Sequence, residues 1–433
     1  MSRTTRVAAL TAALMTVTLA GCAQTDTGTA APATKEAAAP LTYVIPTSWA
    51  EAATLKDAVA AFTKSSGQEV KLQAVPDEKY NEVVLSRLAG GQGMDVFAGA
   101  YNLFDVPNSL VEISGEKFES RMDAIGLDSL RWTDGKIYSF PSPTPRSTFG
   151  VFYNKLVFAD AGVTVPTSLT DFATALKTFK GKGKTPLYLA GKDGWTLLQH
   201  RNSVNPIMVE SDPEAPGKLS SNSIRWDSIA DLNTQYAALG DWAKAGLLNK
   251  DVLTATYEKS QQALVKGEAA MIVNGSWAIG DLVKASPDAK ENVGFFTFPS
   301  PSGKPVLAVS AVTGIHIAKS SKNIEGAKKF LAFLGDTAQA TAYMAQAPGI
   351  SNFTDVPLPA DVPAAMKDID AAITAGPTTL ATDDAIRVPA PESDLIARYQ
   401  ELLGGRISGA DFMKQQSDAF ISSGKTAGLD GFK

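Results

Sequence analysis

Residues 41–75 read "LTYVIPTSWAEAATLKDAVAAFTKSSGQEVKLQAV" and join two β-prone runs through a helical segment. The first run is apolar, and the closing run "VKLQAV" alternates as a half-buried strand does. Between them, Leu55, Val59 and Phe62 recur at the spacing of one helical face, and Gly67 ends the helix. A strand, a helix and a strand in this order predict a partly parallel sheet that is covered by helices.

The alternation of strands and helices continues along the chain. A second helix, with Val84 and Leu88 facing inward, leads to the strand "MDVFA", and further strands are expected at "AAMIV" (269–273) and "GIHIA" (314–318). The fold class predicted from this order is α/β. About 390 residues follow the N-terminal segment, more than one hydrophobic core usually serves, so we expect two lobes.

The N-terminus has the layout of a secretory signal peptide. Two arginines precede the uncharged run Val7–Ala20, and its 14 residues are too few to cross a bilayer, which needs about 20. "LAGC" (19–22) resembles the bacterial lipobox, and Cys22 is the only cysteine of the chain. The resemblance implies cleavage before Cys22 and attachment of acyl chains to this residue. Stable anchoring takes about two acyl chains, which a diacylated Cys22 would supply. An ordinary cleaved signal with an unrelated cysteine is the alternative.

Residues 22–40 contain no large apolar side chain, and they are rich in Ala, Thr and Pro. Such a segment buries too little surface to offset its ordering entropy, so we expect a lipidated, flexible tether after the signal peptide 1–21. No later stretch is long and apolar enough for a membrane helix. The formal net charge of −5 argues against nucleic acid and against an anionic lipid surface as partners.

Four stretches together resemble the extracellular solute-binding proteins of sugar-type ABC importers. "GKIYSFP" (135–141) is similar to that family's "GKxYGLP", and "FGVFYNK" (149–155) to its "LxYNK". "ALVKGEAAMIVNGSWAIGDL" (263–282) is similar to "FxxGKAAMxxxGxWxxxxL". "GIHIAKSSKNIEGAKKFLAFL" (314–334) is similar to "GxAIxKxSKNPEAAxxFLxFL". With the lipobox upstream, these pieces span nearly the whole mature chain.

The resemblance implies a two-lobed fold like that of type II periplasmic binding proteins. Each lobe would hold a mixed, mainly parallel sheet flanked by helices, with hinge segments between the lobes. The implied N-terminal lobe comprises residues 41–145 and 307–348, and the C-terminal lobe 146–306 and 349–433. The implied crossings lie near Arg146–Val151, Pro299–Leu307 and Pro348–Ser351. In such folds, ligands sit at the carboxyl ends of strands.

The sequence contains no recognisable catalytic set. Neither His200 nor His316 stands in a metal-ligand spacing, and His316 is predicted to be structural because it lies in an alternating strand. No Gly-x-Ser-x-Gly elbow occurs, and "GKGKT" (181–185) lacks the first glycine of a phosphate loop. We therefore expect a protein that is not an enzyme, with no catalytic residue, no metal and no cofactor.

Carbohydrate binding needs aromatic rings for the C–H face of a sugar and polar groups for its hydroxyls. Trp277 follows the strand "AAMIV" at an Asn-Gly turn and is the main candidate for stacking. Trp226 and Trp242 are predicted to be core residues. Arg146 at the first crossing is either a hinge ion pair or a ligand clamp, and Trp49 either lines the site or packs on its own helix. The predicted ligand-binding residues are Trp277, Trp195, Trp49, Asn274, Ser276, Tyr101, Asn102 and Arg146.

These expectations combine into one function. The chain is expected to be a monomeric, extracytoplasmic substrate-binding lipoprotein that passes a carbohydrate to the permease subunits of an ABC importer and touches the membrane through its lipid alone. The same fold with a sugar phosphate, polyamine or other polar solute is one alternative. A surface-anchored polysaccharide-active enzyme is another, because a carboxylate pair of the glycosidase type is not excluded by the sequence.

Overall fold

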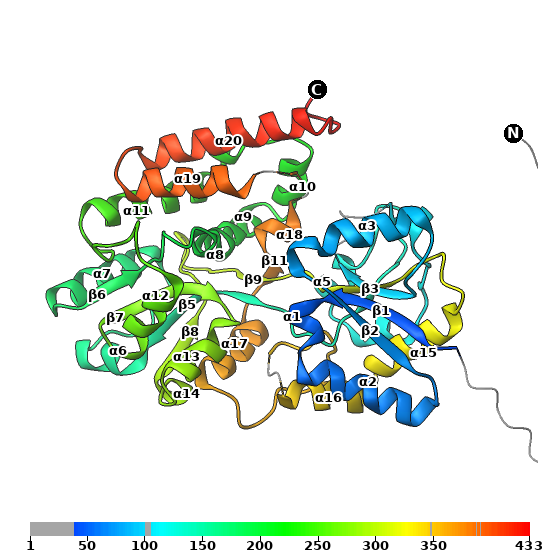
Figure 1. The fold of residues 1–433 in the computed structure, drawn as a ribbon. Coiled ribbons are helices and arrows are strands. Elements are labelled where there is room, and N and C mark those ends of the chain that lie inside the picture. The colour runs from blue at the N-terminus through cyan, green and yellow to red at the C-terminus, as the bar shows by residue number, and fades with distance from the viewer. Residues whose placement is uncertain (1–38, 100–104, 347–348, 387, 390) are drawn as a thin grey trace, which may run out of the picture. The chain divides into compact units, whose positions relative to one another are not determined.

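The structure is a computed structural model that describes residues 39–99, 105–346, 349–386, 388–389 and 391–433. Its main strands form two sheets, each flanked by helices (Figure 1). The first sheet has the order β2 (Val70–Val75), β1 (Leu41–Pro46), β3 (Val96–Gly99), β10 (Gly314–Ile317), β4 (Phe140–Pro141). The second has the order β11 (Thr378–Leu380), β9 (Leu307–Val309), β5 (Thr148–Asn154), β7 (Ala269–Gly275), β6 (Thr185–Tyr188), with β8 (Val293–Phe296) also beside β5.

The helices fall into two groups along the chain. Those in the part of the chain that forms the first sheet are α1 (Thr47–Ala50), α2 (Ala53–Ser66), η1 (Asp77–Lys79), α3 (Tyr80–Gly90), α4 (Val106–Ser109), η3 (Lys117–Arg121), α5 (Ala124–Ser129), α15 (Ile324–Leu334) and α16 (Thr337–Gln346). The others are α6 (Lys155–Ala161), α7 (Leu169–Gly181), α8 (Trp195–Val204), η4 (Asn205–Ile207), α9 (Met208–Ser211), α10 (Ala215–Ser220), η5 (Trp226–Ser228), α11 (Ala230–Lys244), α12 (Tyr257–Val265), α13 (Ala278–Ala285), α14 (Ala289–Asn292), α17 (Ala364–Ala375), α18 (Thr382–Ala385), α19 (Glu392–Leu403) and α20 (Gly409–Thr426).

Local sequence signals explain where several of these helices begin and end. Gly67 and Gly91 follow α2 and α3 with φ angles of 74° and 63°, the left-handed conformation that glycine adopts without steric cost. Ser168 Oγ accepts a hydrogen bond from the Asp171 backbone N–H and caps α7. The predicted end of the first helix at Gly67 is therefore confirmed.

The first sheet separates two apolar clusters, because successive side chains of a strand point to opposite faces. Leu41, Tyr43 and Ile45 of β1 lie in the cluster that contains α2, α15 and α16, whereas Val44 lies in the cluster that contains α3. Figure 1 shows the same arrangement, with α3 on one side of the sheet and α2, α15 and α16 on the other.

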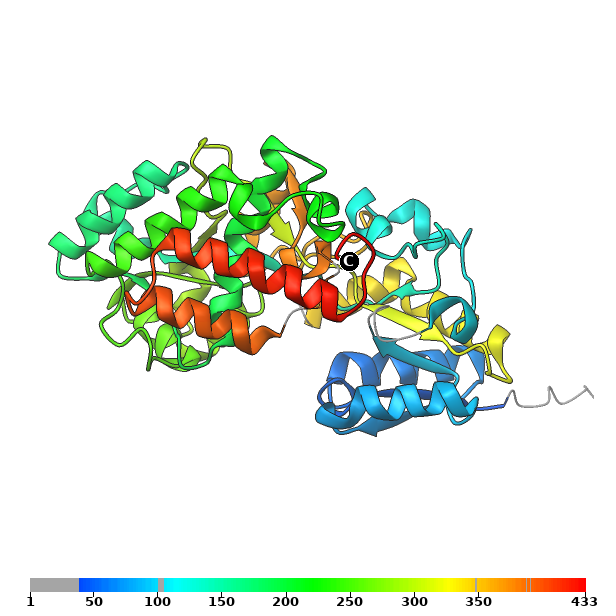
Figure 2. The ribbon, with the colours of Figure 1, turned by 90° about the horizontal axis from the view of Figure 1, so that it is seen from above.

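The second sheet is likewise covered on both faces. Met271 and Val273 of β7 lie in the cluster with α7, α8, α11 and α19, and Ile272 lies in the cluster with α12, α13 and α17. The last two helices, α19 and α20, lie side by side (Figure 2), and Tyr399 packs edge-on against Phe412 at a centroid distance of 4.9 Å. Trp226 and Trp242 are 1% and 5% exposed, which confirms that both are core residues.

Both sheets are mixed, as predicted, but neither is mainly parallel. In the first sheet β1 runs parallel to β2 and β3, while β10 runs antiparallel to β3 and β4. In the second, β5 runs antiparallel to β7, β8 and β9, and only the β6–β7 and β9–β11 pairs are parallel. The antiparallel pairs arise where the chain has crossed from one sheet to the other, because β5 and β10 are the first strands after a crossing.

Two of the three expected crossings lie further along the chain than predicted. The first, from β4 to β5, spans residues 142–147, close to the expected place. The second spans 310–313 and not Pro299–Leu307, because β9 pairs with β5 and β11 in the second sheet. Pro299 is itself held within that part of the chain, where its carbonyl accepts a 2.7 Å hydrogen bond from Gln235 Nε2.

The third crossing follows the segment in which it was expected. Phe353 and Val356 pack in the core of the first sheet, and Val362 is the next residue wholly in a core of the second sheet. The chain therefore crosses between Val356 and Val362, whereas Pro348–Ser351 was predicted and Pro348 lies outside the described residues. The residue boundaries of the two lobes stay a prediction.

A buried polar chain joins three helices of the second part. Tyr236 of α11 donates a 2.7 Å hydrogen bond to Asn205 Oδ1, and its hydroxyl lies 3.0 Å from that of Tyr399 on α19. The Tyr399 hydroxyl lies 3.4 Å from Nδ1 of His200 on α8. His200 is 1% exposed, and burial lowers its pKa from the usual 6.5 to about 3.

We expect this histidine to make folding pH-dependent. The pKa of His200 is lower in the folded state than in the unfolded state. Its contribution to the stability of the folded state is therefore complete above about pH 6.5 and is lost as the pH falls towards 3. Between these two pH values the unfolded chain binds one proton more than the folded chain. The free energy of unfolding therefore falls by about 1.4 kcal/mol for each pH unit of acidification. Denaturant unfolding between pH 6.5 and 5, where ordinary carboxyl groups stay charged, measures this slope.

His200→Gln is the matched variant, since an amide can bond to the Tyr399 hydroxyl but does not titrate. His200→Gln should reduce the slope of the unfolding free energy against pH by the amount that one proton contributes. His316, whose pKa is also lowered by burial, keeps its own contribution to this slope. A slope unchanged by His200→Gln contradicts the interpretation.

Candidate functional site

Three exposed or half-buried tryptophans follow strand ends. Trp49 lies in α1, directly after β1, and Trp277 comes two residues after β7 ends. Trp195 begins α8, the first helix after β6. Side chains that follow strand ends can meet at the carboxyl edge of a sheet, which is where open α/β sheets bind ligands.

Trp49 lines a small cavity beside the first sheet. This Trp49 pocket has a volume of about 170 Å³, and Trp49 also packs against the core of that sheet. A role for Trp49 in ligand binding stays a prediction. The pocket is lined by Tyr43, Ile45, Ser48, Trp49, Ala52, Leu55, Ser142, Pro143, Thr144, Ile315 and Tyr343.

Trp277 lines a larger cavity of about 510 Å³, the Trp277 pocket. Thr144 of the first crossing lines this pocket and the Trp49 pocket, so the two cavities adjoin. Apolar groups dominate the wall, as in most pockets for small molecules. The lining residues are Thr144, Pro145, Arg146, Ser147, Ser276, Trp277, Ile279, Gly280, Val283, Gln346, Gly349, Pro363 and Met366.

The two exposed indoles, Trp277 and Trp195, lie on one surface. Their exposed fractions are 40% and 38%, their ring centroids are 6.4 Å apart, and their planes are inclined by 45°. Phe149 of β5 meets Trp277 edge-on at 5.7 Å, and Tyr257 of α12 lies 5.0 Å from Trp195. Trp277, Trp195 and the half-buried Tyr257 form an aromatic surface beside the Trp277 pocket, and Phe149, which is 6% exposed, is buried against Trp277.

The absence of a side chain at Gly275 makes room for the Trp277 indole. A Cβ atom at position 275 would lie 2.1 Å from that ring. The indole therefore lies back across the end of β7, in a position that only glycine at 275 permits.

Asn274 and Ser276, both predicted to bind ligand, use polar atoms within the fold. Asn274 is 2% exposed, and its Oδ1 accepts a 2.8 Å hydrogen bond from the Gly275 backbone N–H. Ser276 Oγ accepts a 3.1 Å hydrogen bond from the Thr148 backbone N–H, although Ser276 also lines the Trp277 pocket. A role for either residue in ligand binding stays a prediction.

Arg146 forms an ion pair at the first crossing, and its role in ligand binding stays a prediction. Its guanidinium is 6% exposed and forms an ion pair with Asp123, with 3.2 Å between Nη1 and Oδ1. Its backbone N–H donates to the Ile350 carbonyl at 2.8 Å, so the first crossing is joined to the segment before the third. Arg146 also lines the Trp277 pocket, but its charge is already paired by Asp123.

Other predicted residues cannot be placed. Tyr101, Asn102 and Cys22 lie outside the described residues. Sequence reasoning missed three aromatic residues near the candidate site. Tyr343 lines the Trp49 pocket, Phe149 contacts Trp277, and Tyr257 contacts Trp195. Tyr257 follows Thr256, whose side chain caps α12, and an aromatic residue at a helix N-terminus after a loop was the available signal.

The described residues hold no group of three or more His, Cys, Asp or Glu side chains that could bind a metal ion. His316 is buried, with its ring nitrogens 3.2 and 2.9 Å from the Tyr138 and Gly99 carbonyl oxygens, which agrees with a structural role. Within the described ranges, no helix has the length and apolarity needed to cross a membrane.

Comparison with known proteins connects this geometry to one family. The model of the family described as bacterial extracellular solute-binding protein matches residues 46–341. The multiple sugar-binding protein of Streptococcus mutans is 28% identical over 297 residues, which cover 65% of this chain and 68% of that protein. The melibiose/raffinose/stachyose-binding protein MelE of Bacillus subtilis is 24% identical over 312 residues, covering 70% and 71%.

The fold is also found among solved structures. The apo form of RafE from Streptococcus pneumoniae superposes with a TM-score of 0.76, covering 89% of this chain and 98% of that one. Sequence identity to it is 19%, so this similarity concerns the fold alone.

Gly275→Ala tests how the indole is positioned. The new methyl group should push the Trp277 ring from its place, because the two would otherwise overlap. We expect altered tryptophan emission with a nearly unchanged melting temperature, since the outer edge of an exposed side chain can move. The control is the same substitution in a Trp277→Phe background, where the emission of the remaining tryptophans should not change. Equal emission of Gly275→Ala and wild type would falsify the placement.

Proposed function

The chain belongs to the bacterial extracellular solute-binding proteins, and from that membership we propose that it binds a mono- or oligosaccharide and delivers it to the permease of an ABC importer. The ligand would sit in the adjoining Trp49 and Trp277 pockets. Their combined size falls within the range of about 300–1,000 Å³ that small-molecule sites occupy.

The exposed aromatic surface is the observation that carries this proposal. Tryptophan is highly buried on average in folded proteins, yet Trp277 and Trp195 expose 40% and 38% of their surface beside a cavity. An indole face suits the C–H face of a sugar, which covers it and shields it from water. The rim of exposed polar residues would serve the hydroxyl groups.

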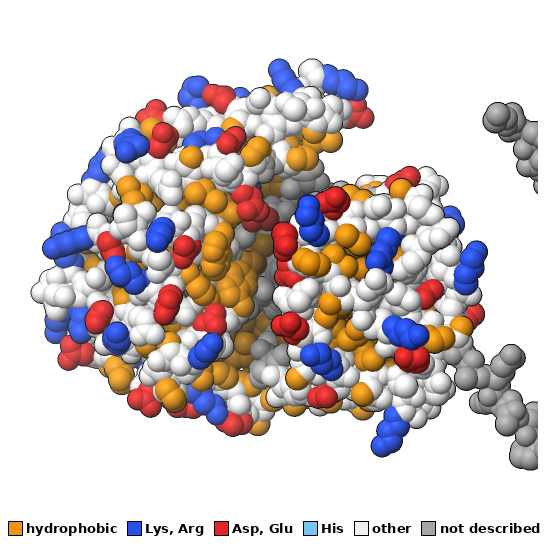
Figure 3. All heavy atoms as spheres, viewed as in Figure 1, with side chains coloured by type: hydrophobic (Ala, Val, Ile, Leu, Met, Phe, Trp, Pro, Cys, Tyr) orange, Lys and Arg blue, Asp and Glu red, His pale blue; other side chains and the backbone are white. Residues whose placement is uncertain are grey.

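The relatives support a carbohydrate over other solutes. One is named for multiple sugars, and the other for melibiose, raffinose and stachyose. The Arg146–Asp123 ion pair removes the main reason for an anionic ligand such as a sugar phosphate. Lys and Arg side chains are interspersed with Asp and Glu over most of the face shown in Figure 3, although several Asp and Glu side chains lie along its central hollow.

The N-terminal segment supports a place outside the cytoplasmic membrane. A charged start, a short apolar run and "LAGC" precede Cys22, and the family is one of extracellular proteins. We propose that acylated Cys22 is the anchor and that the protein acts as a monomer without catalysing a reaction. Its partners are then the sugar and the permease subunits.

Titration with sugars tests the ligand class. A thermal-shift screen of mono- and oligosaccharides selects the ligand, since a compound at 100 times its dissociation constant adds about 2.7 kcal/mol of stability. Trp277→Ala should then weaken binding about five- to 150-fold, because a stacked aromatic ring contributes about 1–3 kcal/mol. Its unliganded melting temperature should hardly change, as the indole is 40% exposed.

Trp242→Ala is the control, because it removes a core indole at a cost of about 3–5 kcal/mol without touching the pockets. It should melt lower and, while folded, bind sugar normally. Normal binding by Trp277→Ala together with a large loss of stability refutes the site. Labelled oligosaccharide recovered in shortened form after incubation refutes the proposal of a binding protein without catalysis.

Lipidation is tested on the protein made in a bacterial host that acylates lipoproteins. Mass spectrometry of the membrane fraction should find a chain that begins at Cys22 and carries acyl groups. Cys22→Ser should be misprocessed or released from the membrane, because no acyl chain can be attached. An unacylated wild-type N-terminus rules out the lipid anchor.

A further inference from the structure

The second crossing, residues 310–313, changes its hydrogen-bond partners from one residue to the next. The Ala311 N–H donates to Asp384 Oδ2 at 2.9 Å, and Asp384 belongs to α18, in the part of the fold with the second sheet. The following N–H, that of Val312, donates to Ser129 Oγ at 3.2 Å, and Ser129 is the last residue of α5, in the part with the first sheet. Consecutive residues of this crossing are therefore held by different parts of the fold.

The first crossing changes partners at a matching place. Arg146 forms its ion pair with Asp123, which precedes α5, whereas the next residue, Ser147, exchanges two hydrogen bonds with Ser310 of the second crossing. The Ser147 N–H donates to Ser310 Oγ at 3.0 Å, and the Ser310 N–H donates to the Ser147 carbonyl at 2.8 Å. In both crossings, the change of partner therefore lies beside the Ser147–Ser310 pair.

The helix that carries Asp384 is itself fixed to the second sheet. Asp383, the preceding residue, forms an ion pair with Arg201 of α8 and accepts a 2.9 Å hydrogen bond from Asn202 Nδ2. The Ala381 N–H, just before α18, donates to a carbonyl of β9 at 2.8 Å. The Asp384 carboxylate therefore stays with the second sheet when the crossing turns.

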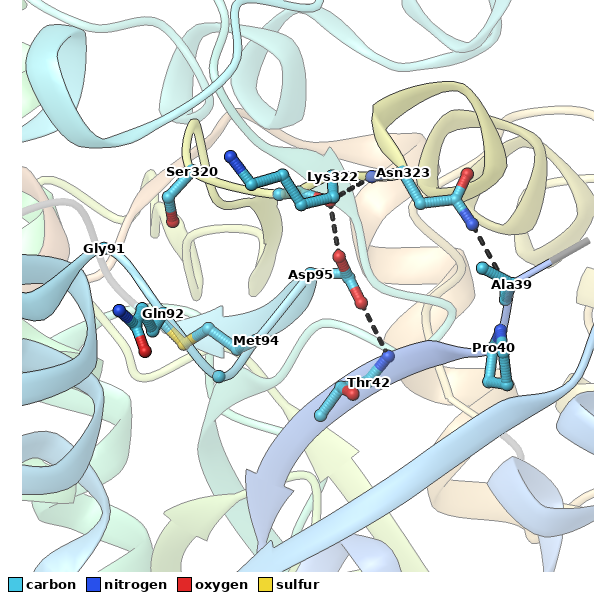
Figure 4. A pocket seen from close by; sticks show the side chains of 12 residues that line it. Ala39, Pro40, Thr42, Gly91, Gln92, Met94, Asp95, Ser320, Lys322 and Asn323 are labelled. Atoms are coloured by element: carbon cyan, nitrogen blue, oxygen red, sulfur yellow. Dashed lines mark hydrogen bonds between the residues drawn. The ribbon is translucent and has the colours of Figure 1, made fainter. Parts of the chain in front are cut away.

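Asp95 is another carboxylate that holds the backbone, but it differs from Asp384 in one respect. Asp95 lines a cavity of about 580 Å³ near the start of β1, where it accepts hydrogen bonds from the Thr42 N–H at 2.8 Å and from the Ser321 hydroxyl (Figure 4). Both of these partners belong to the part with the first sheet, so a movement between the parts does not affect them. Asp384 instead holds a residue of a segment that both parts share.

We propose that Asp384 and Ser129 are positioning residues of the hinge, which confine the turning of the second crossing to the link between Ala311 and Val312. A crossing held on both sides of one link has few conformations, so it loses little freedom when the parts close on a ligand. Loss of either bond frees further torsions of the crossing and weakens binding. The effect on binding rests on the proposed function and adds to it how the hinge is held.

The Asp384 bond makes this hinge sensitive to pH. Burial raises the pKa of Asp384 above its usual 3.8, the bond from the Ala311 N–H opposes this rise, and the charge of Asp383 adds to it. Hydrogen bonds to a carboxylate are about twice as strong as those between neutral groups. The strong bond is therefore complete above the pKa of Asp384 and is lost as the pH falls through it, so acidification should weaken ligand binding.

The elements packed against α18 bring few charges to Asp384. Arg201 of α8 is paired with Asp383, and Lys218 of α10 has acidic partners of its own. Residues 310–313 of the crossing carry no charged side chain, and Arg387 lies outside the described residues. Asp383 is thus the neighbour whose charge acts on the Asp384 carboxyl.

Hydrogen exchange of the ligand-free protein tests the hold on the crossing without any sugar. Asp384→Ala and Ser129→Ala should each speed the exchange of residues 310–313 about fivefold at pH 7.5, the effect expected for one hydrogen bond. Asp95→Asn is the control, and it should leave this segment as in wild type. Exchange at the wild-type rate in both alanine variants overturns the proposal.

Calorimetric titration from pH 7.5 to about 4.5 tests the effect on binding, with melibiose, raffinose and maltotriose as probes. Wild type should bind progressively more weakly on acidification, by up to about fivefold. Asp384→Asn has a neutral acceptor at every pH, so it should bind about fivefold more weakly than wild type at pH 7.5 and lose this pH dependence. Asp383→Asn removes the neighbouring charge, so the loss of affinity should move to lower pH.

The outcomes separate the hinge from the function beneath it. Wild-type affinity and an unchanged pH profile in Asp384→Asn refute the role in binding, while sugar binding itself stands. If no probe binds to wild type, the proposed function falls, and the exchange rates alone decide whether the two residues hold the crossing. Unliganded melting of each variant confirms that it is folded.

Discussion

Two hydrogen bonds between Thr148 and Ser276 connect the parts on which the site depends. The Thr148 N–H donates to Ser276 Oγ at 3.1 Å, and the Ser276 N–H donates to the Thr148 carbonyl at 2.9 Å. Both residues are buried, so loss of one partner would leave the other unsatisfied away from water. Because β5 begins here after the first crossing and β7 ends here before Trp277, this pair sets where the indole lies relative to the crossing.

The crossings use their own polar groups to stay in place. The Ser310 N–H donates to the Ser147 carbonyl at 2.8 Å, and the Ala311 N–H donates to Asp384 Oδ2 at 2.9 Å. With the Arg146–Asp123 ion pair, these bonds tie the first and second crossings to each other and to both parts of the fold. Charged and polar residues near the Trp277 pocket therefore divide into those that hold the backbone and those left for a ligand.

Periodicity predicted the elements well, but it could not predict how they meet. Leu55 and Phe62 are buried in α2 as the helical spacing indicates, because the apolar face of a helix must pack on a sheet. The second crossing was misplaced because β9 is only three residues long and pairs with strands far away in the sequence. Exposed Trp195 and buried Trp226 differ in their surroundings, which local sequence does not record.

The sequence alone determined the α/β class, the family resemblance and the tryptophans that follow strands, because these features depend on local periodicity and on short motifs. The tertiary structure decided which polar side chains also hold the fold. Arg146 and Ser276 are predicted ligand groups, and the structure adds that Arg146 pairs with Asp123 and that Ser276 Oγ accepts from the Thr148 N–H. Tyr257 at the start of α12 meets Trp195 at the start of α8 although these two helices cover opposite faces of the second sheet. Hydrogen-bond partners distant in sequence are chosen by packing, and packing is a property of the whole chain.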